Sequence, residues 1–258
     1  MFGFMIKKAF FDYWDNFFHM AILNIVLVFS FAIPLALAPL LVEISPPLSL
    51  AVMIIGILWC GVALSASSLY VNEIAQFRSV EAKHFFRFLK EGWKTGILFA
   101  LIWGAVVLLV TMTFPFYTAM GNMIGLAAVA FLFWTLVIFV LSMQYYFPVR
   151  DQLSSKPGKV LKKMFIVFFD NALFSIGLFL VATVTFVASG FTAFLLFGPA
   201  GALLLGNVGL KLRLYKYDWY EENPGQNRRK VPWSALVHED RQRLGKRSFR
   251  GMLFPWKD

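Results

Sequence analysis

Long apolar runs are the feature that most constrains this chain, because a transmembrane helix needs about 20 mostly apolar residues. Six stretches meet or nearly meet that length, at 18–42, 47–72, 96–117, 123–147, 172–195 and 199–214. The last two come from one run that is too long for a single helix, and FGPAG at 197–201 supplies the turn that divides it. The sequence therefore predicts an all-α polytopic membrane protein with six transmembrane helices.

The basic residues indicate how these spans are oriented. Lys and Arg lie before the first span, between the second and third, between the fourth and fifth, and after the sixth. The other three connections, VEISPP, YTAMGN and FGPAG, contain none. By the positive-inside rule, both termini are expected in the cytoplasm of a bacterial cell with the chain in its inner membrane. Residues 1–215 then form the six-span bundle, and 216–258 form a basic cytoplasmic tail.

The composition decides how the net charge is interpreted. Apolar residues make up 59% of the chain and charged residues 15%, whereas soluble domains carry about a quarter charged residues. The net charge of +10 is therefore expected to meet the anionic headgroups of membrane lipids, and no nucleic acid is expected as a partner. RNA or ribosome binding by the tail stays an alternative, without a recognisable fold to support it.

Three amphipathic segments precede the first, third and fifth spans and align on Asp15–Asn16, Glu91–Gly92 and Asp170–Asn171. Helical spacing of apolar residues predicts helices that lie in the membrane interface, with their rings among the acyl chains. The expected interface residues are Phe10, Trp14, Phe17, Phe85, Leu89, Trp93, Phe165 and Phe168. We therefore predict three hairpins, each preceded by an interfacial helix that bends into the bilayer at Asn or Gly; ordinary juxtamembrane anchors are the alternative.

Residues that usually carry catalysis or metal binding are sparse. No predicted span has an ionisable residue near its centre, and the three histidines lie far apart without a metal-ligand spacing. We predict no enzyme activity, no metal and no cofactor. An enzyme acting on lipid would need a cluster at the membrane rim, for which Asn72, Glu73 and Arg78 are the candidates.

The polar residues inside the spans are small side chains or amides. Gly56, Cys60 and Ser67 share one face of the second span, where small residues let helices approach closely. Asn24 and Asn207 are the two intramembrane amides. Each could pair internally or line a polar pocket.

The extreme C-terminus, GMLFPWKD, closes a polar tail with large apolar side chains. Such groups need a surface to bury against, which can be the bundle, the bilayer or a partner. The predicted partner-binding residues are Met252, Leu253, Phe254 and Trp256.

Two stretches, AILNIVLVFSFAIPLALAP and FFRFLKEGWKTGILFALIW, resemble the YesL-like family of bacterial membrane proteins, whose function is unknown. The matching residues are Asn24, Pro39, Phe85, Phe86 and Trp93. The chain departs from the family's pattern where a Trp often follows the Asn, and in its long basic tail. The resemblance implies six spans and an association with carbohydrate import systems.

These observations favour a non-catalytic membrane component, such as an accessory or scaffold subunit of a bacterial transport or envelope assembly. It would bind a membrane-protein partner or a second copy of itself. The alternative is a transporter or permease for a neutral solute such as a sugar, for which aromatic rings and amides suffice. The coupling pattern of binding-protein-dependent permeases is not matched, because Arg87 stands where that pattern after Val80-Glu81-Ala82 needs glycine.

Overall fold

The computed structural model describes residues 1–225, 231–245 and 247, and within them every regular element is a helix. The predicted partner-binding residues Met252, Leu253, Phe254 and Trp256 lie outside this part of the chain. The elements are α1 (Phe2–Asp15), α2 (Phe17–Val42), α3 (Pro46–Ala75), α4 (Ala82–Ala119), α5 (Met123–Met143), α6 (Tyr146–Gln152), α7 (Pro157–Asp170), α8 (Ala172–Ser189), the 3₁₀ turn η1 (Gly190–Thr192), α9 (Pro199–Glu222), α10 (Trp233–Leu236) and α11 (His238–Leu244).

The chain is a multi-pass membrane protein, and its described part is all-helical. Among the described residues, five helical stretches are long and apolar enough to cross a membrane: Phe17–Val42, Pro46–Ala75, Ala82–Ala119, Met123–Gln152 and Ala172–Thr192. They overlap the first five predicted spans, although Ala82–Ala119 begins well before the predicted 96–117. The sixth predicted stretch, 199–214, is the beginning of α9, which is not one of these five because its apolar part stops at Lys211.

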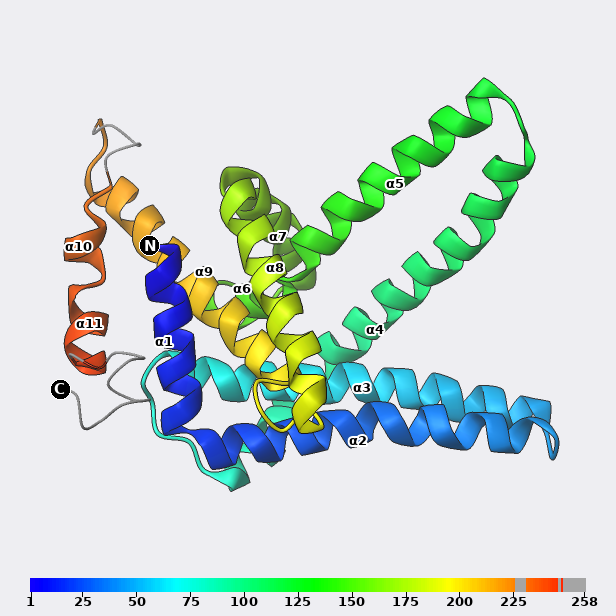
Figure 1. The fold of residues 1–258 in the computed structure, drawn as a ribbon, viewed down its shortest axis with the longest axis horizontal. Coiled ribbons are helices and arrows are strands. Elements are labelled where there is room, and N and C mark those ends of the chain that lie inside the picture. Colours follow the sequence, from blue (N-terminus) through cyan, green and yellow to red (C-terminus); the bar gives the residue numbers. More distant parts are fainter. Residues whose placement is uncertain (226–230, 246, 248–258) are drawn as a thin grey trace.

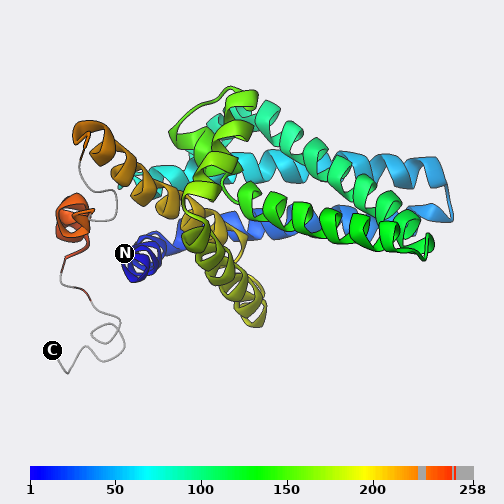
Figure 2. The same ribbon diagram turned by 90° about the horizontal axis from the view of Figure 1, so that it is seen from above.

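The helices form two arms that diverge from a common base (Figure 1). Helices α2 and α3 lie side by side in one arm, and the α4–α5 hairpin forms the other. Helices α8 and α9 pack together near the base. Seen from above, α1, the second half of α9 and the tail helices gather at the end opposite the tips of the two arms (Figure 2). We call this the charged end.

Small residues hold α3 against α2, as the sequence predicts. A Cβ atom on Gly56 would lie 2.3 Å from the Pro34 side chain, so only glycine fits there. One turn further along, the Cys60 thiol donates to the carbonyl oxygen of Ser30 at 2.9 Å. Both contacts bring the two helices close together.

Helices α3 and α4 cross at Gly61 and Gly96, with their backbones in direct contact. A Cβ atom on Gly96 would lie 2.5 Å from the carbonyl oxygen of Gly61 and 2.6 Å from the Cα of Val62. This crossing fixes the base from which the α4–α5 arm leaves the body of the protein.

Two of the three predicted interfacial helices are separate elements. Helix α1 ends next to Asn16 and α7 next to Asn171, and each asparagine side chain donates to the carbonyl oxygen four residues earlier, at 2.9 Å and 3.2 Å. The third prediction is wrong in this respect, because α4 runs unbroken through Gly92. Gly92 has no capping side chain and instead admits the hydroxyl of Ser65, which a Cβ would approach to 2.5 Å.

The predicted interface residues divide between surface and core. Trp14 and Trp93 are about half exposed, and Phe10 stacks on Trp14 and on Phe197. Phe17, Phe85, Leu89 and Phe165 are partly buried against the core. Phe168 is only 5% exposed, which leaves its ring no surface to offer to lipid.

Candidate functional site

A buried layer of polar side chains joins α3, α4, α6 and α9 near the base of the two arms. Arg150 on α6 is its centre: Nη1 donates to the hydroxyl of Ser65 at 2.7 Å and to that of Thr95 at 2.8 Å. Its Nη2 donates to the carbonyl oxygen of Ser65 at 2.8 Å, and its Nε pairs with Asp151. The side chains of Arg150 and Asp151 are 5% and 0% exposed. An ion pair this deeply buried must be hydrogen-bonded on all sides to offset its lost hydration.

Helix α9 completes the polar layer through Asn207. The Ser68 hydroxyl donates to Asp151 at 2.5 Å and accepts from the Asn207 amide at 3.3 Å. The Asn207 side-chain oxygen in turn accepts from the amide nitrogen of Gln152 at 3.1 Å. The Asn207 amide, which the sequence predicts to lie in the membrane, therefore pairs internally, in a network that the sequence does not reveal.

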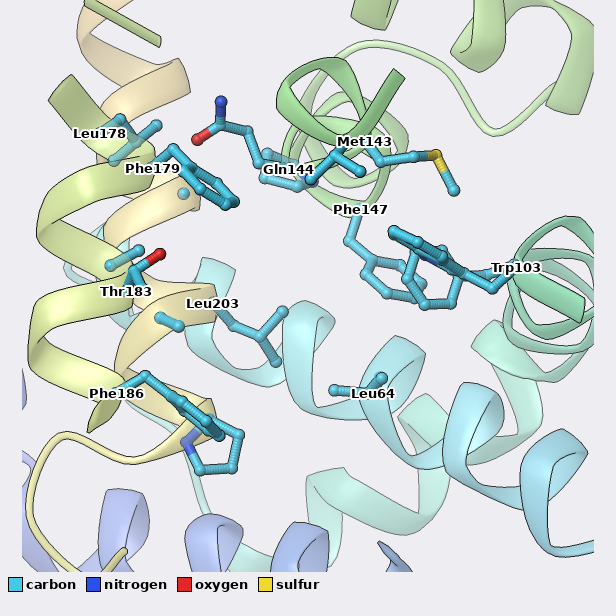
Figure 3. Close-up of a pocket in the computed structure, with 17 residues that line it drawn as sticks. Leu64, Trp103, Met143, Gln144, Phe147, Leu178, Phe179, Thr183, Phe186 and Leu203 are labelled. Carbon is cyan, nitrogen blue, oxygen red and sulfur yellow. The ribbon is translucent and has the colours of Figure 1, made fainter. Parts of the chain in front are cut away.

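An apolar cavity of about 440 Å³ lies on one side of the polar layer. Figure 3 shows it lined by Leu203 on α9, Trp103 on α4, and Leu178, Phe179 and Phe186 on α8. The lining is almost entirely aliphatic and aromatic, with Gln144 and Thr183 as its polar side chains.

A polar cavity of about 510 Å³ lies on the other side, at the charged end. Its lining includes the rim cluster Asn72, Glu73 and Arg78, which the sequence singled out. Glu73 accepts from Arg78 at 3.2 Å. Sequence reasoning missed the cavity itself, because its other walls come from α4, α6 and α9, and the last two lie far away along the chain.

Each of the four helices passes the apolar cavity, the polar layer and the polar cavity in the same spatial order. The residues at these three levels are Leu64, Ser68 and Asn72 on α3; Phe99, Thr95 and Glu91 on α4; Pro148, Arg150 and Gln152 on α6; and Gly206, Asn207 and Lys211 on α9. The polar layer is therefore a partition between two cavities in series.

The other intramembrane amide, Asn24, has a structural role. Its side-chain oxygen accepts from the backbone N–H of Ala200 at 2.8 Å, which satisfies one of the free donors at the start of α9. Its side-chain nitrogen donates to the carbonyl oxygen of Leu195 and to the hydroxyl of Tyr13, both at 3.1 Å. Asn24 thus fixes the loop that joins α8 to α9.

The ring of Phe77 lies at the centre of a second cluster of charged side chains, next to the polar cavity. This residue has a φ of 58°, a left-handed conformation that costs a non-glycine residue about 1–3 kcal/mol. The ammonium groups of Lys8 and Lys211 lie 3.4 Å and 4.8 Å from the centre of its ring. Lys8 also pairs with Asp12 at 2.7 Å, and Lys211 with Asp240 of the tail at 3.2 Å.

The described part of the tail thus folds back on the body. Val237 and Leu244 are buried, and Arg247 forms two hydrogen bonds of 2.7 Å with Asp15. The guanidinium of Arg243 lies over the ring of Phe77. We call the contact of α11 through Asp240 and Lys211 the tail latch.

Replacing Asp240 by Asn should release the tail latch, because Lys211 would keep a buried charge without its carboxylate partner. We expect trypsin to cleave at Arg241 and Arg243 at least about tenfold faster in the variant. Glu239→Gln, on the exposed side of α11, is the matched control and should cleave at the parent rate. An unchanged rate in Asp240→Asn would show that this ion pair does not hold the tail.

Asp12 should make stability depend on pH. Burial raises its pKa to about 6, because lost hydration outweighs the attraction of Lys8. Between about pH 4 and pH 6, Asp12 therefore keeps its proton in the folded protein, whereas in the unfolded chain, where its pKa has the ordinary value of 3.8, it has released it. This contribution to stability is full below about pH 4 and is lost as the pH rises through about 6. We expect the thermal midpoint of the parent minus that of Asp12→Asn to be larger at pH 5 than at pH 7.5; equal differences would count against this assignment.

Comparisons of the chain with protein-family models, with curated proteins and with solved structures give no match. The interpretation of the site therefore rests on its own geometry, whose principal feature is two cavities separated by the polar layer.

Proposed function

We propose that the protein is a transporter that moves a small uncharged solute through the space between α3, α4, α6 and α9. The observation that carries this proposal is the order of apolar cavity, polar layer and polar cavity along all four helices. An alternating-access pathway needs such a partition, whose hydrogen bonds can open and re-form. The hydrocarbon lining of the apolar cavity argues against a charged solute.

We further propose a six-span topology in which α9 is the last span and the charged end faces the cytoplasm of a bacterial inner membrane. The one-sided distribution of Lys and Arg supports this orientation. The basic residues of α9 have local partners: Lys211 donates to the carbonyl oxygen of Ala75, and the guanidinium of Arg213 lies 3.6 Å from the centre of the Phe174 ring. The resemblance to the YesL-like family implies the same number of spans.

The proposal can be tested in proteoliposomes loaded with a mixture of small uncharged metabolites. We expect at least one solute to leave faster than from protein-free liposomes. Leu203→Trp, which fills the apolar cavity, should slow this release, whereas Leu180→Trp on the outward face of α8 should not. Equal release of every solute with and without folded protein would rule the proposal out.

A second candidate function, an accessory subunit of a membrane assembly, is favoured by the α4–α5 arm. Only 6% of the most apolar window in Ala82–Ala119 is buried, and the same holds for Met123–Gln152, compared with 33% for Pro46–Ala75. The arm thus presents large apolar residues on most sides, including Leu109, Met112, Phe131 and Trp134. A photoreactive residue at Trp134 should crosslink to one membrane protein or a second copy if this is the function; crosslinks to lipid alone would count against it.

A further inference from the structure

The polar cavity has more acidic than basic groups once its ion pairs are set aside. Arg78 is paired with Glu73, Lys211 with Asp240, and Asp151 with Arg150. Three charged groups lining the cavity form no ion pair within the described part of the chain: Glu91, Asp218 and Arg87. The groups without an ion pair are therefore two carboxylates and one guanidinium, which together carry a net negative charge.

Two buried amide oxygens at the same cavity have no hydrogen-bond donor among the residues that the structure describes. They are Oδ1 of Asn72, a residue only 8% exposed, and Oε1 of Gln152. The Gln152 amide cannot simply be turned round, because its nitrogen already donates to two oxygens of Asn207. A buried acceptor without a donor costs about 1–3 kcal/mol, so both positions favour a ligand that supplies N–H groups.

Two aromatic rings lie among the remaining walls, together with Leu69, Gln76 and Leu214. Phe88 and Tyr215 line the cavity together with the carboxylates. An ammonium group is attracted by carboxylates, by amide oxygens and by the faces of aromatic rings, whereas an anion is repelled by all three.

We propose that the polar cavity is a binding site for a ligand that carries a primary ammonium group. Its N–H groups would donate to the amide oxygens of Asn72 and Gln152, and its charge would be balanced by Glu91 and Asp218. Arg87 would pair with an anionic group on the same ligand, next to its ammonium group. Because the apolar cavity has no charged lining, this ligand is a bound component of the charged end and not the transported solute.

Two kinds of molecule could supply the ammonium group, an aminophospholipid headgroup and a free cytoplasmic amine. The following experiment distinguishes them. The purified full chain is examined by native mass spectrometry in micelles that contain equal amounts of phosphatidylethanolamine and phosphatidylcholine. Binding of ethanolamine and of putrescine is measured in parallel by calorimetry in detergent. Preferential retention of phosphatidylethanolamine identifies the headgroup, because phosphatidylcholine lacks N–H donors; binding of a free amine identifies the soluble source.

The double variant Glu91→Gln/Asp218→Asn changes exposed side chains and should leave the fold intact. We expect it to weaken binding at least about tenfold, while Glu43→Gln, in the loop between α2 and α3, binds as the parent does. No preference between the lipids together with no amine binding would overturn the proposal, as would equal weakening in the Glu43→Gln control. Binding requires no transport, so this site and the transport function can fail separately.

Discussion

Replacing Arg150 by alanine is expected to destabilise the protein by about 3–5 kcal/mol, because it leaves the buried carboxylate of Asp151 without its cation. The same change removes three hydrogen bonds to Ser65 and Thr95, which weakens the attachment of α6 to both α3 and α4. The unfolding midpoint in detergent, compared with that of the parent, measures the effect.

The matched control for this prediction is Arg87→Ala, which removes an exposed arginine at the charged end and should change stability little. The double variant Arg150→Ala/Asp151→Ala removes both buried charges, and we expect it to recover much of the loss. If the double variant were as unstable as the sum of the two single variants, the ion pair would not be the source of the effect.

Gly96→Ala is expected to be the second severe substitution. Its added methyl group would lie within 2.6 Å of backbone atoms of Gly61 and Val62, which cannot move aside as a flexible side chain can. Overpacked side-chain contacts usually cost about 1–3 kcal/mol, and this backbone contact should cost at least the upper end of that range. Thermal unfolding should show it directly.

Gly104, two turns further along α4, provides the comparison. A Cβ atom there meets nothing within 4 Å, so Gly104→Ala should be neutral or gain up to about 1 kcal/mol from the better helix propensity of alanine. Equal effects at Gly96 and Gly104 would mean that the α3–α4 crossing is looser than its geometry indicates.

The helices were predictable because their information is local. Apolar runs of bilayer length gave the positions of the first five spans, and Asn16 and Asn171 marked two helix ends through their own side-chain hydrogen bonds. Gly92 does not mark a helix end. It is a glycine because the Ser65 side chain on α3 packs against it, and a single sequence does not show which residues of another helix lie nearby.

The candidate site was predictable only in fragments. Asn72, Glu73 and Asn207 were identified as unusual polar residues, whereas Arg150 was counted only among the basic residues between the fourth and fifth predicted spans, and its pairing with Asp151 was not predicted. Their burial depends on the short helix α6, which turns them towards Ser65 on α3. Such long-range pairing leaves no periodic signal in a single sequence. The same reason applies to Asp240, whose partner Lys211 lies across the tail latch.

The central claim is that the polar layer separates two cavities, and cysteine accessibility tests it most directly. In a Cys60→Ala background, the sites are Gln76→Cys in the polar cavity, Leu203→Cys in the apolar cavity and Leu180→Cys on the outward face of α8. A membrane-impermeant thiol reagent is added outside inside-out membrane vesicles. In these vesicles the charged end is expected to face outward, towards the reagent.

We predict fast labelling of Gln76→Cys and at least about tenfold slower labelling of Leu203→Cys while the polar layer is intact. Adding Arg150→Ala/Asp151→Ala should make Leu203→Cys reactive and leave Leu180→Cys protected. Labelling of Leu203→Cys as fast as Gln76→Cys in the intact protein, or its continued protection after the layer is removed, would contradict the claim.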